Sequence, residues 1–211
     1  MHAPVDSLLV FVLLINLFML GTSRVRAVIA GSALQGVILG LLAVMLHFSM
    51  QTALVAVGAV IVRGIVIPRL LHKAMRDLAI HREVEPFIGF VPSVLVGALG
   101  TGLALVFSST LPLVEAHKGS LVVPASFATV LTGFLILTTR RKAITQVVGY
   151  LVLENGVFIM GLVLLEAMPF LVEVGVLLDL FVAIMVMGII INHISREFAS
   201  LDTDRLSQLK E

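Results

Sequence analysis

Seven stretches of about twenty residues in this chain hold few or no charged side chains. A run of this length is long enough to cross the hydrocarbon core of a bilayer as an α-helix. Because lipid offers no hydrogen-bonding partners, the backbone of each stretch has to bond to itself, and a helix does so locally. We therefore expect an all-α, multi-pass transmembrane fold of about seven spans. The predicted spans are residues 6–22, 25–46, 52–73, 87–109, 121–139, 144–165 and 170–195.

The cations of the chain predict how these spans are oriented. If the N-terminus lies outside the cell, the loops at 24–26, 69–82 and 140–142 and the C-terminal tail all lie inside. They hold two, four, three and three Lys or Arg, which is 12 of the 14; the outer loops hold Lys118, and Arg63 lies within a span. This bias follows the positive-inside rule for an outside N-terminus and an inside C-terminus. The first run has no preceding cation, so we expect an uncleaved span and not a signal peptide.

The composition gives no support to catalysis by this chain alone. It has no cysteine, which excludes thiolate-held iron–sulfur clusters, nickel–iron sites and disulfides on this chain. Of its six histidines, no two are predicted to face each other near the bilayer midplane, as a bis-His haem would require. No nucleophile array, phosphate-binding loop, metal-ligand spacing or nucleic-acid-binding patch is present in the sequence. We expect no cofactor on the chain, no independent enzymatic activity and no nucleic-acid partner.

Glu154 lies in the middle of the sixth predicted span. An ionised carboxylate is costly at that depth, so an intramembrane acid is by default a functional-site hypothesis. A polar stripe leads to it along one face of the helix, because its members recur every four residues: Lys142, Gln146, Tyr150 and Glu154. The stripe covers about 18 Å from the inner surface, and it could form half of a proton-access route. The alternative is that Glu154 is a neutral packing residue, hydrogen-bonded across to Asp179.

The last predicted span carries a second central acid. Asp179 lies about ten residues into this span, and His193 follows it by 14 residues on nearly the same helical face. Glu173 is six residues before Asp179 and about 120° away around the helix, so it faces a different neighbour or the headgroups. We include Asp179, Glu173 and His193 among the candidate proton-relay residues.

Arg63 is the unusual residue of the third span. A guanidinium stays charged, so Arg63 needs a counter-ion or a path of water, unless its side chain extends toward the inner surface. Pro68 frees a backbone carbonyl near Gly64, and this carbonyl could be a further polar partner. Arg63 is therefore another relay candidate. Asn16 and Gln35 are single polar residues in the first two spans, and we expect them to form helix–helix hydrogen bonds.

Two spans carry small residues at intervals of four positions, which allows helix backbones to approach closely. We expect these residues to form packing seams, with a neighbour either in this chain or in another subunit. They are Ser32, Gly36 and Gly40 in the second span and Ser93, Gly97 and Thr101 in the fourth.

Residues 69–85 interleave apolar side chains with cations. This inner basic loop is expected to continue the third helix out of the bilayer or to lie at the inner interface, either as a docking segment or as a solvated helix.

A family resemblance rests on two stretches, TRRKAITQVVGYLVLENGVFIMGL (139–162) and VEVGVLLDLFVAIMVMGI (172–189). They resemble hydrogenase-4 component E, a membrane subunit of energy-converting hydrogenases of the formate hydrogenlyase type, and this resemblance covers the full length. Residues 121–195 are also similar to the K subunit of respiratory complex I and to the C subunit of Mrp-type cation/proton antiporters. The resemblance implies four N-terminal helices (1–120) and a three-helix K-subunit-like region with a short cytoplasmic tail (121–211).

The residues that match the family pattern lie mainly in the sixth span. Arg140 and Arg141 take the place of an inner-side Arg pair, Gly149 and Asn155 that of a Gly and an Asn, and Asp179 that of the second intramembrane glutamate of the K subunit. The first acid departs from the pattern. In the K subunit it comes two residues after the Gly, whereas here Leu151 stands there and Glu154 comes five residues after the Gly. The acid keeps roughly the same face but moves about 4.5 Å along the helix axis.

The resemblance implies partners that include large antiporter-like subunits and a hydrogenase or related oxidoreductase arm, in a prokaryotic inner membrane. Iron–sulfur and nickel–iron centres are then expected on the partner subunits. We expect a non-redox membrane-arm subunit whose carboxylates help to translocate protons or another cation. The alternative is a scaffold between pumping subunits, with the acids as buried hydrogen-bonding groups. An independent small transporter fits less well, because no internal repeat relates the two halves.

Overall fold

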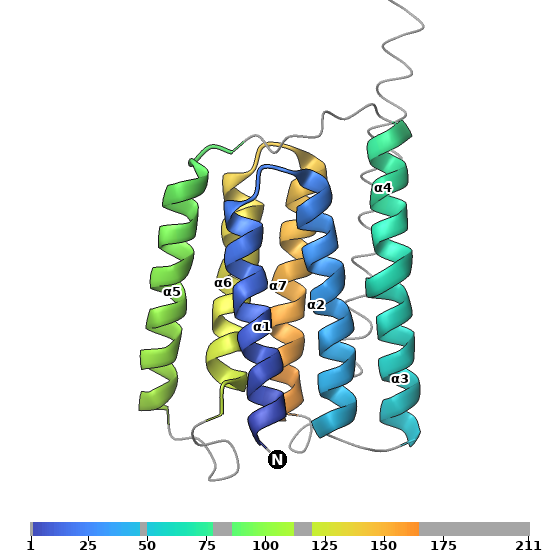
Figure 1. The fold of residues 1–211 in the computed structure, drawn as a ribbon, viewed down its shortest axis with the longest axis vertical. Helices are drawn as coiled ribbons and strands as arrows, with labels where there is room; N and C mark the ends of the chain where they lie inside the picture. The colour runs from blue at the N-terminus through green and yellow to red at the C-terminus, as the bar shows by residue number, and fades with distance from the viewer. Residues whose placement is uncertain (1, 47–49, 78–85, 112–119, 165–211) are drawn as a thin grey trace, which may run out of the picture.

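The computed structural model describes residues 2–46, 50–77, 86–111 and 120–164. Within these ranges the chain is helical, and an isolated β-bridge pairs Pro86 with Arg140. The helices run side by side as one bundle (Figure 1). In chain order they are α1 (His2–Gly21), α2 (Val25–Leu46), α3 (Met50–Ile61), the π-helical turn η1 (Val62–Val66), α4 (Ile67–Asp77), α5 (Phe90–Thr110), α6 (Val122–Thr139) and α7 (Ala143–Leu164).

The predicted spans correspond closely to these helices. Of the described helices, five are long and apolar enough to cross a membrane: α1, α2, α5, α6 and α7. The predicted third span, 52–73, is the continuous helical segment α3–η1–α4, which runs from Met50 to Asp77. This segment carries the first part of the basic loop as helix, as expected. The seventh predicted span, 170–195, lies outside the described residues, so the count of seven and the division at residue 120 stay predictions.

The cation-bearing turns lie together at one end of the bundle. Figure 1 shows the α1–α2 turn, the end of α4 and the α6–α7 turn at the same end, opposite the N-terminus. This arrangement agrees with the grouping of cations along the sequence. Which side of a membrane this end faces stays a prediction.

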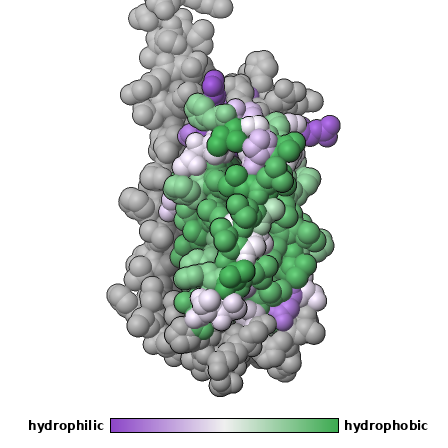
Figure 2. Space-filling model, turned by 90° about the vertical axis from the view of Figure 1, so that its left-hand side faces the viewer, coloured by the Kyte–Doolittle hydropathy of each residue, from purple (hydrophilic) through white to green (hydrophobic). Residues whose placement is uncertain are grey.

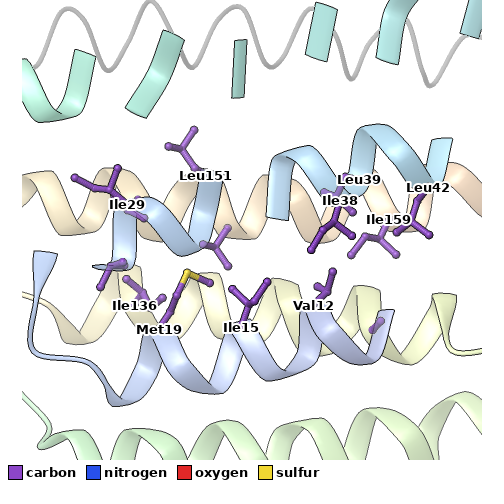
Figure 3. Close-up of a cluster of buried hydrophobic side chains, with 14 of the residues drawn as sticks. Val12, Ile15, Met19, Ile29, Ile38, Leu39, Leu42, Ile136, Leu151 and Ile159 are labelled. Atoms are coloured by element: carbon purple, nitrogen blue, oxygen red, sulfur yellow. The ribbon is translucent and has the colours of Figure 1, made fainter. Parts of the chain in front are cut away.

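The centre of the bundle consists of α1, α2, α6 and α7. α5 packs on one side against α1 and α6, and α3–η1–α4 packs on the other side against α2 (Figure 1). Aliphatic side chains from all four central helices fill the interior, among them Val12, Ile29, Ile136 and Ile159 (Figure 3). Because lipid tails are as apolar as these side chains, close packing holds such helices together in a bilayer, with no gain from leaving water.

Both predicted seams of small residues pack within this chain. In α2, a Cβ added at Gly36 would lie 2.7 Å from Cβ of Arg63, and one added at Gly40 would overlap the side chain of Val60. In α5, a Cβ added at Gly97 would overlap the side chain of Leu20. The neighbours are therefore η1 and α3 for the second span, and α1 for the fourth.

A direct backbone contact between α6 and α7 was not predicted. A Cβ added at Gly149 would lie 2.6 Å from the backbone nitrogen of Leu137, and one added at Gly156 would lie 2.5 Å from the backbone nitrogen of Val130. The hydroxyl of Ser126 also donates to the carbonyl of Gly156 at 2.9 Å. The two backbones touch directly, so this helix pair is closely packed around the stretch that carries Glu154.

The outer face of α5 is almost entirely apolar. Figure 2 shows this side of the molecule as a hydrophobic belt between paler and hydrophilic ends. The exposed large side chains of α5 run over its whole length; they include Val91, Leu95, Leu99, Leu103 and Val106. A belt of this kind is the surface expected to contact hydrocarbon.

Candidate functional site

A π-helical turn places Arg63 in the middle of the third predicted span. In this turn the N–H of Ile67 bonds to the carbonyl of Val62, five residues back. Pro68 explains the widening, because proline has no N–H and its ring cannot lie against the carbonyl of Gly64, four residues earlier. Turns of this type are found frequently at functional sites. Arg63 itself is buried, with 9% of its surface exposed.

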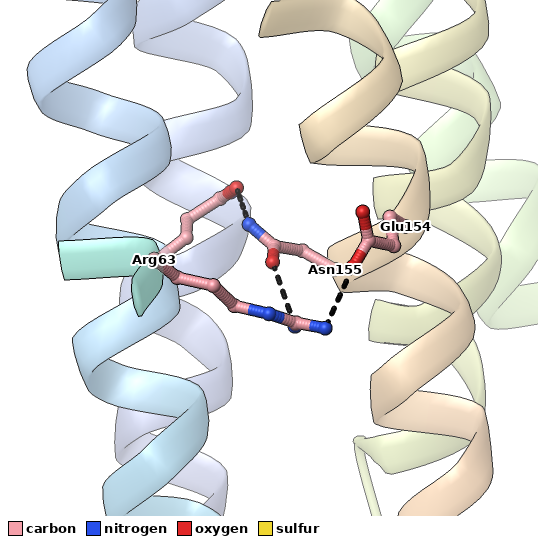
Figure 4. A network of polar contacts seen from close by, with 4 residues as sticks. Arg63, Glu154 and Asn155 are labelled. Atoms are coloured by element: carbon pink, nitrogen blue, oxygen red, sulfur yellow. Dashed lines mark hydrogen bonds and ion pairs between the residues drawn. The ribbon is translucent and has the colours of Figure 1, made fainter. Parts of the chain in front are cut away.

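Arg63 forms a buried ion pair with Glu154 of α7 (Figure 4). Its Nη2 lies 2.7 Å from Oε1 of Glu154, and each side chain is 8% exposed. Its Nη1 donates to Oδ1 of Asn155 at 3.2 Å, and its guanidinium lies 4.9 Å from the ring centre of Phe158. Of the alternatives for Arg63, the structure thus shows a counter-ion instead of extension to the surface. The two charges were considered separately in the sequence, and their pairing was missed.

A chain of side-chain hydrogen bonds continues from this ion pair across the bundle. Asn155 donates to Oε1 of Gln35 at 3.5 Å, Gln35 donates to Oδ1 of Asn16 at 2.7 Å, and Asn16 donates to Oγ1 of Thr129 at 2.9 Å. The hydroxyl of Thr129 donates in turn to the carbonyl of Ala125 at 2.7 Å. Asn16 and Gln35 do form the predicted helix–helix bonds, and the structure adds that these bonds lead to Arg63.

A small cavity lies beside the ion pair. The volume of this cavity is about 10 Å³, which is about the smallest volume that can hold one water molecule. Its walls come from α2, η1, α4 and α7: Ser32, Arg63, Ile67, Leu151, Glu154 and Asn155. The ion pair therefore lies next to a space in which a water could reach its polar atoms.

The two arginines of the α6–α7 turn have different environments. Arg140 is 1% exposed, donates through Nη2 to the carbonyl of Leu20 at 2.8 Å, and stacks 5.0 Å from the ring centre of Phe90. Burial lowers the pKa of the Arg140 guanidinium from its ordinary value. Arg141 is exposed and lies 4.6 Å from the ring centre of Phe87. Arg140 thus joins the ends of α1 and α5 to the turn, whereas Arg141 lies at the surface.

Comparison with known proteins identifies distant homologues of the chain. No protein-family model and no solved structure matches the chain. The uncharacterized protein Rv0085 of Mycobacterium tuberculosis is 36% identical over 165 residues, which are 75% of this chain and 74% of the relative. Hydrogenase-4 component E of Escherichia coli K12 is 27% identical over 162 residues, 76% of this chain and 74% of that protein. The chain is thus a distant homologue of hydrogenase-4 component E. The predicted resemblance to hydrogenase-4 component E is confirmed over about 76% of the chain. The similarity of residues 121–195 to the complex I K subunit and the Mrp C subunit stays a prediction.

The structure describes only some of the other predicted site residues. Gln146 donates to the carbonyl of Arg140 at 2.9 Å, so its amide faces the α6–α7 turn. Lys142, just before α7, and Tyr150, within it, are both half-buried. The use of this stripe as a proton route stays a prediction. The candidates of the last span lie outside the described residues; they are Glu173, Asp179 and His193.

Among the residues that the structure describes, no group of histidine, aspartate and glutamate side chains could hold a metal ion.

Proposed function

We propose that this chain is a non-redox membrane subunit of an energy-converting hydrogenase or a related complex I-like oxidoreductase, and that its Arg63–Glu154 pair takes part in proton translocation. Distant homology to hydrogenase-4 component E supports the first part. The observation that carries the second part is the buried ion pair, with an N–O distance of 2.7 Å. Its carboxylate lies in the middle of α7, one of the five described helices suited to a bilayer.

The energetics of such a pair suit a switch. Removing one partner of a buried ion pair costs about 3–5 kcal/mol, because the other charge is left without compensation. Moving one elementary charge against a potential of 100 mV takes about 2.3 kcal/mol. Since the two energies are similar, a charge or conformational change in a neighbouring subunit could separate Glu154 from Arg63. A water in the adjacent cavity could then exchange a proton with the carboxylate.

The partners of the chain follow from this proposal. Antiporter-like membrane subunits would carry the proton onward, and iron–sulfur and nickel–iron centres would belong to a peripheral arm, since this chain has no cysteine. Asp179 is the proposed second carboxylate of the relay. The complex would lie in a prokaryotic inner membrane, with the cation-rich end of the bundle toward the cytoplasm.

The test is to replace Glu154 by Gln and, separately, Asp179 by Asn, in the assembled complex. Asp6→Asn is the matched control. Asp6 lies near the N-terminal end of α1 and accepts the backbone N–H of Leu121 at 3.0 Å, whereas Glu154 lies in the middle of α7. Native gels report assembly, and a pH-sensitive dye in membrane vesicles reports proton transport driven by the redox reaction. We expect the first two variants to assemble with transport strongly reduced, and Asp6→Asn to retain it. Full transport in both variants would refute the proton role.

A scaffold role is the second candidate, and the direct backbone contact between α6 and α7 favours it. In that case Glu154→Gln would keep full transport, because an amide can still accept from Arg63. Gly36→Leu would instead abolish assembly, because α2 would be forced away from η1. Glu154→Gln distinguishes the candidates, and Gly36→Leu tests the packing of α2 on η1, which both of them require.

A further inference from the structure

The buried amides beside the ion pair have a fixed direction of hydrogen bonding. A guanidinium only donates, so Asn155 has to turn its oxygen toward Arg63 and its NH₂ group toward Gln35. Gln35 then has to accept from Asn155, and it donates to Asn16 at 2.7 Å. Arg63 therefore determines the orientation of every amide in this series. We name it the amide chain, and define it as Asn155, Gln35, Asn16 and its terminal acceptor Thr129.

The far end of the amide chain leaves no donor without an acceptor. Asn16 donates to Thr129, and the Thr129 hydroxyl donates to the carbonyl of Ala125 in its own helix. The side chains of the amide chain are shielded from solvent: Asn16, Gln35 and Thr129 are 0% exposed and Asn155 is 3% exposed. At such a site the alternative to these bonds is an unsatisfied polar group, so the chain is held in this one arrangement.

All dipoles of the amide chain point the same way. Each link donates away from Arg63, so the negative, oxygen end of every amide is directed toward the guanidinium (Figure 4 shows the first links). Hydrogen bonds aligned in this manner polarise and strengthen one another in a medium of low dielectric constant. The series therefore acts on the Arg63 cation as an ordered solvation shell would.

We propose that the amide chain is a positioning device that solvates the Arg63 cation independently of Glu154, so that Arg63 stays in place while Glu154 is neutral or turned away. The carboxylate and the amide chain approach the guanidinium through different nitrogens, Nη2 and Nη1. Loss of the first contact therefore leaves the second intact. Only the use of this property in proton exchange rests on the proposed function; the solvation of Arg63 does not.

The test is a double-mutant cycle on the purified full chain in lipid nanodiscs, with Glu154→Gln and Gln35→Met as the two changes. Glu154→Gln weakens the ion pair and Gln35→Met weakens the amide chain, whereas the double variant weakens both sources of stabilisation of the Arg63 cation. We expect the melting temperature of the double variant to fall by about 4 °C more than the sum of the two single changes. Gln146→Met is the matched control. Its amide bonds to a backbone carbonyl outside the amide chain. The fall in melting temperature of the Glu154→Gln, Gln146→Met double variant should therefore equal the sum of the two single falls.

A milder pair keeps the test decisive if the Gln35 variants do not fold. Thr129→Val keeps the shape of the side chain but removes the terminal acceptor, and Thr101→Val is its control. Both hydroxyls donate to the carbonyl four residues earlier, at 2.7 Å and 2.8 Å. When Thr129→Val is combined with Glu154→Gln, the melting temperature should again fall by more than the sum of the two single changes, but by a smaller margin than with Gln35→Met. When Thr101→Val is combined with Glu154→Gln, the two single changes should simply add.

If the changes in melting temperature simply add when Glu154→Gln is combined with Gln35→Met and with Thr129→Val, the inference is overturned, because side chains that only fill space predict additivity. This outcome is separate from that of the transport experiment. Excess destabilisation together with full proton transport in Glu154→Gln would leave the inference intact and refute the proposed function.

Discussion

Gly36→Ala should separate α2 from η1 and loosen the Arg63–Glu154 pair. The added Cβ would lie 2.7 Å from Cβ of Arg63, whereas carbon atoms in contact are normally about 3.5–4.0 Å apart. The obstructing atom is the first of the Arg63 side chain, so it cannot rotate away, and the helices have to move apart by about 1 Å. A shift of that size would extend the pair, now at 2.7 Å, beyond the range of a good hydrogen bond, about 3.2 Å.

The expected cost follows from two opposing effects. Inserting a methyl group into a well-packed contact costs about 1–3 kcal/mol, and replacing Gly by Ala inside a helix returns up to about 1 kcal/mol. The net loss of stability is therefore up to about 2 kcal/mol. Gly102→Ala in α5 is the matched control, because an added Cβ there meets nothing within 4 Å among the described residues. It should gain about 0.5–1 kcal/mol from helix propensity alone.

Two measurements check this prediction. Thermal unfolding of both variants in nanodiscs should show Gly36→Ala less stable than Gly102→Ala, by about 1–3 kcal/mol, which is the packing cost itself. Redox-driven proton transport of the assembled complex should fall in Gly36→Ala and stay unchanged in Gly102→Ala. Equal stability and equal transport in the two variants would show that Gly36 does not position Arg63.

Two further predictions concern the packing of the bundle. Gly40→Cys combined with Val60→Cys should form a disulfide under mild oxidation, since the added Cβ lies 3.6 Å from Cβ of Val60 and disulfides join Cβ atoms about 3.5–4.5 Å apart. The chain has no cysteine of its own. The control replaces Val57, which is 58% exposed, by cysteine in place of Val60, and it should form no disulfide with Gly40→Cys. If a non-reducing gel shows cross-links only between chains, the packing of α2 on α3 is contradicted. Arg140→Lys should cost about 1–3 kcal/mol in unfolding experiments, because lysine cannot both reach the Leu20 carbonyl and stack on Phe90. Arg141→Lys should stay within about 0.5 kcal/mol, and equal losses in both would contradict an anchoring role for Arg140.

The helices of the bundle were predictable because their hydrogen bonds are local. In lipid each backbone group has to bond within its own helix, so an uncharged run of sufficient length is enough to identify a span. The predicted second span, 25–46, coincides with α2, and the predicted 144–165 differs from α7 by one residue at each end. The π-helical turn was not predicted, although Pro68 five residues after Arg63 is a signal for it.

The pairing of Arg63 with Glu154 had a signal that was not used. Both residues lie ten positions from the inner ends of their predicted spans, 52–73 and 144–165, so they are at similar depth in the membrane. Similar depth does not show which helices are neighbours. That information came from Gly36, whose missing side chain brings η1 against α2, and from α2 packing on α7.

The amino-acid sequence alone determines that this chain is helical, that most of it is suited to a bilayer, and that a few charged groups lie deep inside. These properties follow from composition and from backbone hydrogen bonds between near neighbours. The tertiary structure alone decides that Arg63 meets Glu154 across 91 residues of sequence, and that the amides of three helices align toward the same cation. Partner choice depends on how each helix is rotated and which helix it touches, and small residues set this through contacts between segments far apart in the chain.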